Sequence, residues 1–227
     1  MNQSNKMGSA GVPILMIAIG LLVGFGITMV SASAYYNNKL DTAKVATTDT
    51  KAADLRANLV TLGVEHMTLT NQAVDAALDG SPSAAATGAA LYANGNSIGA
   101  AVGSVYGKDA ETTFDKVWKL HLDEFVKYAV AGKTGDAAGK QAALDSIQQN
   151  YTVPLAQYLA KANPNLPVGV LQSALSDHVA MTATMIDDHV KGDYVAEAAQ
   201  LDMANTHIKD LFSTLSGGIV KQYPSKF

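Results

Sequence analysis

The chain contains no cysteine, which excludes disulfides, thiolate metal sites, iron–sulfur clusters, cysteine nucleophiles and a lipoprotein anchor. Charged residues are also scarce, at 16% of 227 residues, and the net charge is −4 without any basic cluster. Binding to a phosphate backbone needs a Lys/Arg surface, so we do not expect a nucleic acid partner. Without disulfides, the protein must be held together by packing alone, which suits a helical bundle rich in alanine and leucine.

The N-terminal region contains an apolar segment, residues 12–30, that carries no charge. These nineteen residues would span about 28 Å as a helix, close to the hydrocarbon thickness of a bilayer, which favours a transmembrane anchor. The sequence Ala32-Ser33-Ala34 is typical of a signal-peptidase site and favours cleavage after Ala34. In both alternatives the rest of the chain is exported, so we expect an extracytoplasmic protein, membrane-bound through residues 12–30 or secreted.

After residue 50, apolar residues recur every three or four positions, which is the period of an amphipathic helix. No stretch alternates with a period of two for long enough to predict a strand. Turn signals indicate three helical hairpins, at 51–107, 111–164 and 167 to 218 or soon after. We therefore predict an all-α fold, a six-helix bundle plus an N-terminal transmembrane or signal helix. The predicted organisation is a signal anchor or signal peptide (1–34), a polar tether (35–50) and the bundle (51–227).

A histidine and a glycine recur at one fixed offset in the three hairpins. A glycine follows His66, His121 and His178 fourteen residues later in each case. The histidines are 55 and 57 residues apart, which is the length of one hairpin. Such self-similarity predicts three quasi-repeats. Each histidine lies on the apolar stripe of its helix, so all three should point inward at mid-helix.

This pattern predicts a metal site. Neutral imidazoles on facing helices are common ligands of zinc, copper and iron, and nearby carboxylates join or orient them. Acidic residues directly precede two of the histidines, a third acidic residue lies one turn after His121, and a fourth inward histidine lies on a return helix. The predicted site comprises His66, His121, His178, His207, Glu65, Glu124 and Asp177. Copper or zinc is the expected ion, for storage, buffering or sensing.

A structural network is the alternative interpretation of the same histidines. A buried polar group without a partner costs about 1–3 kcal/mol, so asparagines such as Asn94, Asn150 and Asn205 could instead bond the rings and set the hairpin register. The protein would then be a non-catalytic envelope interaction module with an envelope protein or polymer as its partner. Ring nitrogens that converge on one point would indicate a metal, whereas separately bonded rings would indicate a network.

An enzyme is the third alternative, and the motifs favour it least. The chain has no di-iron Glu-x-x-His pair, no Gly-x-Ser-x-Gly and no phosphate-binding loop. Thr70 and Thr182 lie one turn beyond a histidine, but a hydroxyl in mid-helix commonly bonds the carbonyl four residues back. We expect Trp118 to be a core residue, and His189 with its charged neighbours to be a solvated helix end. An open coordination position beside a pocket would strengthen the enzyme alternative.

Several of these elements resemble a family of exported helical proteins from bacilli and some archaea. Its acidic-His-x-x-x-Thr element is matched by residues 65–70 and 177–182. Residues 94–99 resemble its Asn-x-x-Asp-Ile-Gly element, with Ser97 in place of the aspartate, and residues 217–227 resemble its Gly-Ile-x-Lys-Gln-aromatic-Pro tail. The family tends to have a tryptophan after the first histidine, where this chain has Leu69. The resemblance covers most of the chain after Leu55 and implies the helical fold and the histidine pattern, but no activity.

Overall fold

The computed structural model describes residues 48–227, so the predicted N-terminal helix lies outside the described residues. Within the described part, Lys51–Phe227 form one compact unit whose regular secondary structure is entirely helical. The prediction of an all-α bundle is therefore confirmed. None of the described helices combines the length and the apolar character that a membrane crossing requires.

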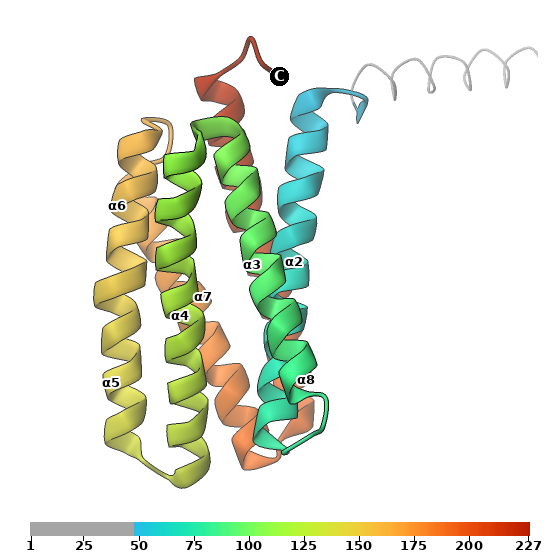
Figure 1. The fold of residues 1–227 in the computed structure, drawn as a ribbon, viewed down its shortest axis with the longest axis vertical. Helices are drawn as coiled ribbons and strands as arrows, with labels where there is room; N and C mark the ends of the chain where they lie inside the picture. The colour runs from blue at the N-terminus through green and yellow to red at the C-terminus, as the bar shows by residue number, and fades with distance from the viewer. Residues whose placement is uncertain (1–47) are drawn as a thin grey trace, which may run out of the picture. The chain divides into compact units, whose positions relative to one another are not determined.

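The described bundle has six helices if the helix that a π-turn interrupts is counted as one (Figure 1). The elements are α2 (Lys51–Leu78), α3 (Ala84–Tyr106), α4 (Lys108–Thr134), α5 (Ala137–Ile147), the π-helix η1 (Gln148–Thr152), α6 (Val153–Ala162), α7 (Val168–Lys191) and α8 (Tyr194–Gln222). Helix α4 starts directly after Gly107, earlier than the predicted start near Glu111, because one glycine at φ 93° makes the whole turn. Helix α8 continues past Gly217 and Gly218 to Gln222.

The three hairpin turns share one hydrogen-bond pattern. The repeated glycine adopts a left-handed conformation in each, with φ of 67°, 72° and 76° at Gly80, Gly135 and Gly192. The amide of the following residue then donates to the carbonyl five positions earlier, at 2.8–2.9 Å in all three turns. This is the Schellman arrangement, which glycine favours because it has no Cβ. The fixed offset between histidine and glycine therefore corresponds to a fixed distance between each histidine and its turn.

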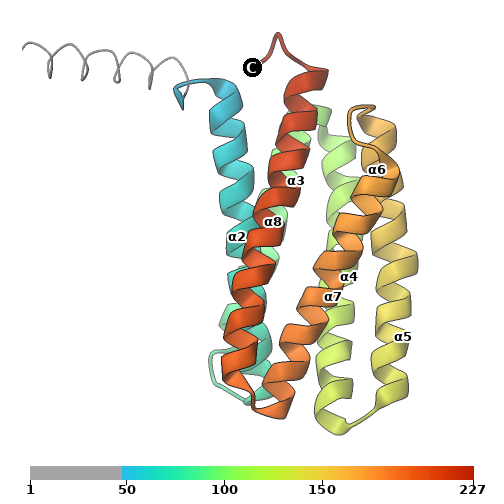
Figure 2. The same cartoon turned by 180° about the vertical axis from the view of Figure 1, so that it is seen from behind.

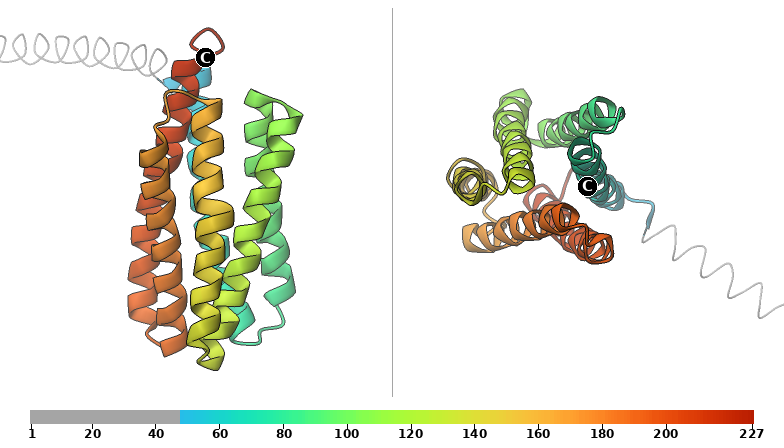
Figure 3. Two further views of the ribbon diagram at one scale, coloured as in Figure 1. Left: turned by 90° about the vertical axis from the view of Figure 1, so that its left-hand side faces the viewer. Right: turned by 90° about the horizontal axis from the view of Figure 1, so that it is seen from below.

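The hairpins are α2/α3, α4/α5–α6 and α7/α8, and their turns lie at the same end of the bundle (Figures 1 and 2). The first helices of the hairpins, α2, α4 and α7, contact one another. Viewed along the bundle, the hairpins surround a common centre (Figure 3). Inward residues of α2, α4 and α7 therefore meet at this centre.

The C-terminal tail joins the hairpins at the end opposite the turns. Gln222 Nε2 donates to the Ala162 carbonyl at 2.7 Å, and its Oε1 accepts from the Tyr106 hydroxyl at 2.9 Å. Asn163 Nδ2 donates to the same hydroxyl at 3.1 Å. A Cβ on Gly218 would lie 2.6 Å from Leu166 Cδ2, so this glycine lets α8 approach the loop before α7. These contacts give the tail motif a structural role.

Candidate metal centre

The three repeated histidines meet at the centre of the bundle. Fourteen residues of helix correspond to about 21 Å, so each ring lies at the same depth below its turn. Ring centroids are 5.7 Å apart for His66 and His121, 5.8 Å for His66 and His178, and 6.4 Å for His121 and His178. One ring nitrogen of each residue lies within 4.8 Å of the other two. We refer to these three residues as the histidine triad.

The triad is almost fully buried and has few hydrogen-bond partners. The exposed fractions are 1% for His66, 0% for His121 and 2% for His178. Both ring nitrogens of His121 and His178, and Nδ1 of His66, are buried without a hydrogen-bond partner. An unpaired buried polar group costs about 1–3 kcal/mol, so an orphaned group in a folded protein calls for an explanation such as an ion or a water.

Burial keeps the triad rings neutral. The pKa of His66 falls to about 3, first because of burial and then because of His178. The pKa of His178 falls to about 4, through burial and the proximity of His207. Burial and the other two rings also hold the pKa of His121 well below its usual value, and the nearby Trp118 backbone, with which the ring makes no hydrogen bond of normal geometry, opposes this shift. Neutral imidazole is the form that binds a metal, so no proton competes at neutral pH.

The triad spacing is close to that of a three-histidine metal site. Ring nitrogens bound to a tetrahedral metal at about 2.0–2.1 Å lie about 3.4 Å from one another. Contracting a triangle with sides of 4.8 Å to that size moves each nitrogen by less than about 1 Å. Side-chain rotation can supply such a movement. Three neutral imidazoles suit zinc, copper, iron or nickel and leave one tetrahedral position for another ligand.

Two aromatic residues form one wall of the triad. The Trp118 ring lies 4.9 Å from that of His66 and 4.7 Å from that of His121, centroid to centroid. Tyr151 stacks on His121 at 4.2 Å with an interplanar angle of 19°. A Cβ on Gly95 would lie 2.8 Å from Trp118 Cδ1, so this glycine makes room for the indole. Trp118 is a core residue as predicted, but it also contacts the site, which its helical phase alone did not show.

Tyr151 reaches His121 because it lies in the π-helix η1. Pro154, two residues after η1, has no amide hydrogen and its ring crowds the carbonyl four residues earlier, so a wider turn relieves the helix there. Both Tyr151 and the neighbouring Thr152 are almost completely buried, and Thr152 Oγ1 has no hydrogen-bond partner. Sequence periodicity did not identify Tyr151, although the proline indicates a local irregularity in this helix.

The other predicted ligands do not join the triad. His207 is half-buried and its Nε2 lies 2.8 Å from the Ala174 carbonyl. Glu65 and Asp177 are exposed, because a residue next to an inward histidine points about 100° away around the helix. Glu124 is buried, but it pairs with Lys127 at 2.8 Å. Of the seven predicted ligands, the structure brings together only the three repeated histidines.

The asparagines of the alternative network do not bond the triad either. Asn94 Nδ2 donates to the Leu62 carbonyl and to Glu65, at 3.1 and 3.0 Å. Asn150 Nδ2 donates to Ser146 at 3.2 Å, and Asn205 Oδ1 is buried without a partner. Among the described residues, none of these asparagines bonds a ring of the triad.

The threonines of the repeated element bond backbone carbonyls, as predicted. Thr70 Oγ1 donates to the carbonyl of His66 at 2.8 Å, and Thr182 Oγ1 donates to that of His178 at 2.9 Å. Each hydroxyl donor is therefore used within its own helix. In the acidic-His-x-x-x-Thr element, a buried histidine is therefore followed by a threonine that lies four residues closer to the hairpin turn and whose hydroxyl already has a hydrogen-bond acceptor.

A cavity of about 240 Å³ lies beside the triad, lined by residues of α2, α3, α4 and α7. All three histidines line it, together with Thr70 and Thr182. Most of the remaining lining is apolar, and much of it is small, for example Ala73, Gly88 and Ala129. The cavity therefore adjoins the triad and offers space for an additional metal ligand.

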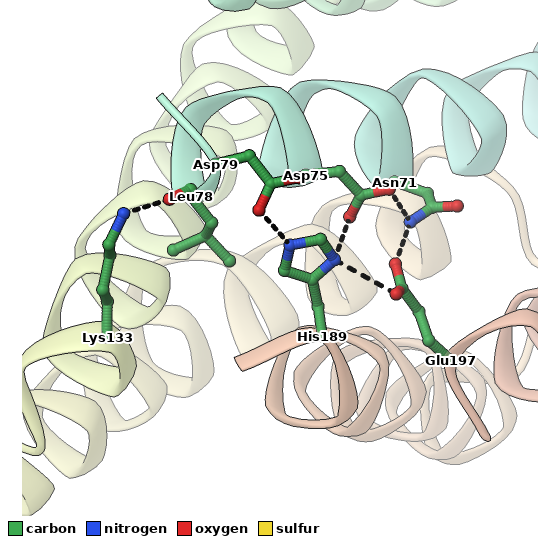
Figure 4. A network of polar contacts seen from close by, with 7 residues as sticks. All are labelled: Asn71, Asp75, Leu78, Asp79, Lys133, His189 and Glu197. Atoms are coloured by element: carbon green, nitrogen blue, oxygen red, sulfur yellow. Dashed lines mark hydrogen bonds and ion pairs between the residues drawn. The ribbon is translucent and has the colours of Figure 1, made fainter. Parts of the chain in front are cut away.

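A second polar cluster surrounds His189, which the sequence predicted to be solvated. His189 is only 7% exposed, and Nδ1 lies 3.0 Å from Asp75 and 3.1 Å from Glu197. Its Nε2 lies 3.1 Å from Asp79 (Figure 4). The prediction was wrong because α2, more than a hundred residues away in sequence, supplies the two aspartates that cover the ring. Burial lowers the pKa of His189, but the three carboxylates reverse this effect and raise it overall.

Comparisons with known proteins provide no relative. No protein-family model, no curated protein and no solved structure matches this chain.

Proposed function

We propose that this chain is an extracytoplasmic protein, tethered by residues 12–30, that binds a transition metal through His66, His121 and His178. The observation that carries the proposal is the burial of three neutral imidazoles, of which one nitrogen each converges and five of the six ring nitrogens lack hydrogen-bond partners. A purely structural histidine network would be expected to satisfy these nitrogens. A bound cation would satisfy one nitrogen of each ring at once.

Zinc and copper are the proposed ions. Imidazole is a borderline ligand that suits both, and the site contains no thiolate to select a softer metal. The exported location is proposed from the sequence of residues 12–30 and Ala32-Ser33-Ala34. Storage, buffering or sensing of the metal would use the triad as its binding site.

A metal-dependent enzyme is a second candidate function, which the cavity beside the triad favours. Catalytic zinc sites keep one position open for water or substrate, and three histidines can supply the protein ligands. No general acid or base among the predicted carboxylates lies at the triad. Binding is therefore the primary proposal.

Metal analysis of the full-length protein tests the proposal. We expect about one zinc or copper per chain after loading and dialysis, and loss of that metal in the His66→Ala and His178→Ala variants. His207→Ala is the control, because His207 lies near His178 but its Nε2 already bonds the Ala174 carbonyl. Circular dichroism of every variant would establish that the bundle is folded.

Two results would contradict the proposal. One is a folded wild-type protein that binds no metal under these conditions. The other is metal that remains in the triad variants but disappears in His189→Ala, which would assign binding to the group formed by Asp75, His189 and Glu197.

A further inference from the structure

The cavity beside the triad has a composition that restricts its ligand. Among the described residues that line the cavity there is no Asp or Glu, and Lys133 is the only lysine or arginine. Val126 and Val130, one turn apart on α4, belong to the lining although 56% and 57% of their surfaces are exposed. The cavity is therefore an apolar space between exposed valines and three buried histidines.

The cavity volume indicates the size of ligand that would fit. An apolar protein cavity of about 150 Å³ accommodates benzene. A volume of about 240 Å³ therefore has room for one ring, or a short chain, together with a small head group. Drug-sized ligands occupy pockets of about 300 Å³ or more, so the expected ligand is smaller than these.

The charge of the proposed metal centre indicates the nature of the head group. Three neutral imidazoles leave the full charge of a divalent ion in a buried site, and no carboxylate contributes to the pKa shifts of the triad. Burying an uncompensated charge is costly, whereas an anionic fourth ligand would offset it.

We propose that the cavity binds a small apolar carboxylate, whose head group occupies the fourth position of the metal and whose apolar body fills the space between α2, α3 and α4. This inference rests on the proposed metal site and adds its ligand class. The three buried histidines with unpaired nitrogens distinguish the cavity from an ordinary packing defect. Lys133 Nζ donates to the carbonyl of Leu78, the last residue of α2 (Figure 4). Leu78 lies twelve residues along α2 from His66, so this cation is away from the triad.

Gly88 offers a way to fill the cavity without disturbing the fold. It lines the cavity, and a Cβ added there would meet no atom within 4 Å. A leucine in its place would occupy cavity space and would also raise helix propensity. Gly217→Leu is the matched control, because Gly217 is helical, exposed and equally free of neighbours, but does not line the cavity.

The test measures benzoate binding to the full-length protein, loaded with zinc or metal-free, by calorimetry and by the fluorescence of Trp118, the only tryptophan. Toluene serves as an uncharged probe of the cavity. We expect zinc to tighten benzoate binding at least about tenfold and to leave toluene binding unchanged. Gly88→Leu should weaken benzoate binding at least about tenfold at unchanged zinc content, and Gly217→Leu should change neither.

The outcomes separate this inference from the proposed function. A protein that binds neither zinc nor copper overturns both. If zinc binds but the affinity for benzoate changes neither with zinc nor in Gly88→Leu, or fails to change in one of these comparisons, only the ligand inference is overturned. Benzoate that binds equally without zinc and is lost in Lys133→Ala would place the carboxylate beside Lys133, which also overturns it.

Discussion

At the residue scale, the triad combines features that oppose stability in the metal-free protein. His121 is completely buried, both of its ring nitrogens lack partners, and burial depresses its pKa. Its favourable contacts are aromatic, with Tyr151, Trp118 and Phe125. A core chosen only for stability would place an apolar side chain here. Such unfavourable burial is characteristic of residues retained for binding.

The His121→Leu substitution should therefore stabilise the metal-free protein. Leucine fills a similar volume without burying unpaired nitrogens, a gain of about 1–3 kcal/mol that the lost stacking on Tyr151 reduces to about 1 kcal/mol. Urea unfolding at pH 7.5 measures the change, with and without zinc. In the presence of zinc the order should reverse, because only the wild-type protein binds the ion with three ligands.

The pH dependence of the same variant provides a control. A depressed histidine pKa means that the unfolded chain binds protons which the folded protein excludes, so the contribution of the triad to stability falls as the pH drops from about 6.5 towards 4. His121→Leu should reduce this slope. Lower stability of the variant at all pH values in metal-free buffer would contradict the idea that the ring is unsatisfied.

At the element scale, each hairpin depends on one left-handed glycine. The amides that follow Gly135 and Gly192 belong to aspartates whose side chains also cap the next helix, through Gly139 and Ala196. One short turn therefore ends the first helix and starts the second. The first hairpin differs, because Ser83 makes no side-chain cap.

The Gly192→Ala substitution should destabilise the protein by about 1–2 kcal/mol, because a Cβ disfavours the observed φ of 76°. Gly217→Ala is the control, since it replaces an exposed helical glycine with no neighbour within 4 Å and should stabilise by about 0.5–1 kcal/mol. Thermal unfolding of the two variants measures both changes. Equal effects would show that the αL conformation at Gly192 is not required.

At the scale of the whole molecule, the cluster around His189 joins the first and third hairpins near their turns. Asn71 donates to both Asp75 and Glu197 and so connects the carboxylates that face His189 (Figure 4). Burial first, and then hydrogen bonding and charge from Glu197, raise the pKa of Asp75 to about 7, while His189 opposes the shift. The contact between the hairpins therefore depends on protonation.

The Asp75→Asn substitution should remove a contribution to stability that declines as the pH rises, a change in slope opposite in sign to that expected for His121→Leu. The folded protein retains a proton on Asp75 between the unfolded pKa near 3.8 and about 7, so this contribution is complete below pH 4 and declines as the pH rises to 7. The raised pKa of His189 acts with the same sign at higher pH. Urea midpoints from pH 4 to 8 measure the slope, with the exposed Asp202→Asn as control; unchanged slopes in both variants would refute the assignment.

The sequence predicted the helices and part of the candidate metal centre. The apolar stripe of each helix correctly predicted inward histidines. The repeated offset of fourteen residues corresponds to one depth, because a helix has a constant rise and the same turn follows each time. It failed for Glu65 and Asp177, because residues adjacent in sequence lie on different helix faces. It also failed for His189, whose aspartate partners belong to α2.

The sequence by itself thus determined the features that depend on local geometry: helical periodicity, the positions of the turns and the equivalence of three histidines. Only the tertiary structure decided which nitrogens stay without partners, which aromatic rings contact the triad and where a cavity remains. These features depend on whether residues from separate helices, such as Gly88 on α3 and Ala129 on α4, fill the space between the helices. Packing is a property of all three hairpins together, so no single stretch of sequence encodes it.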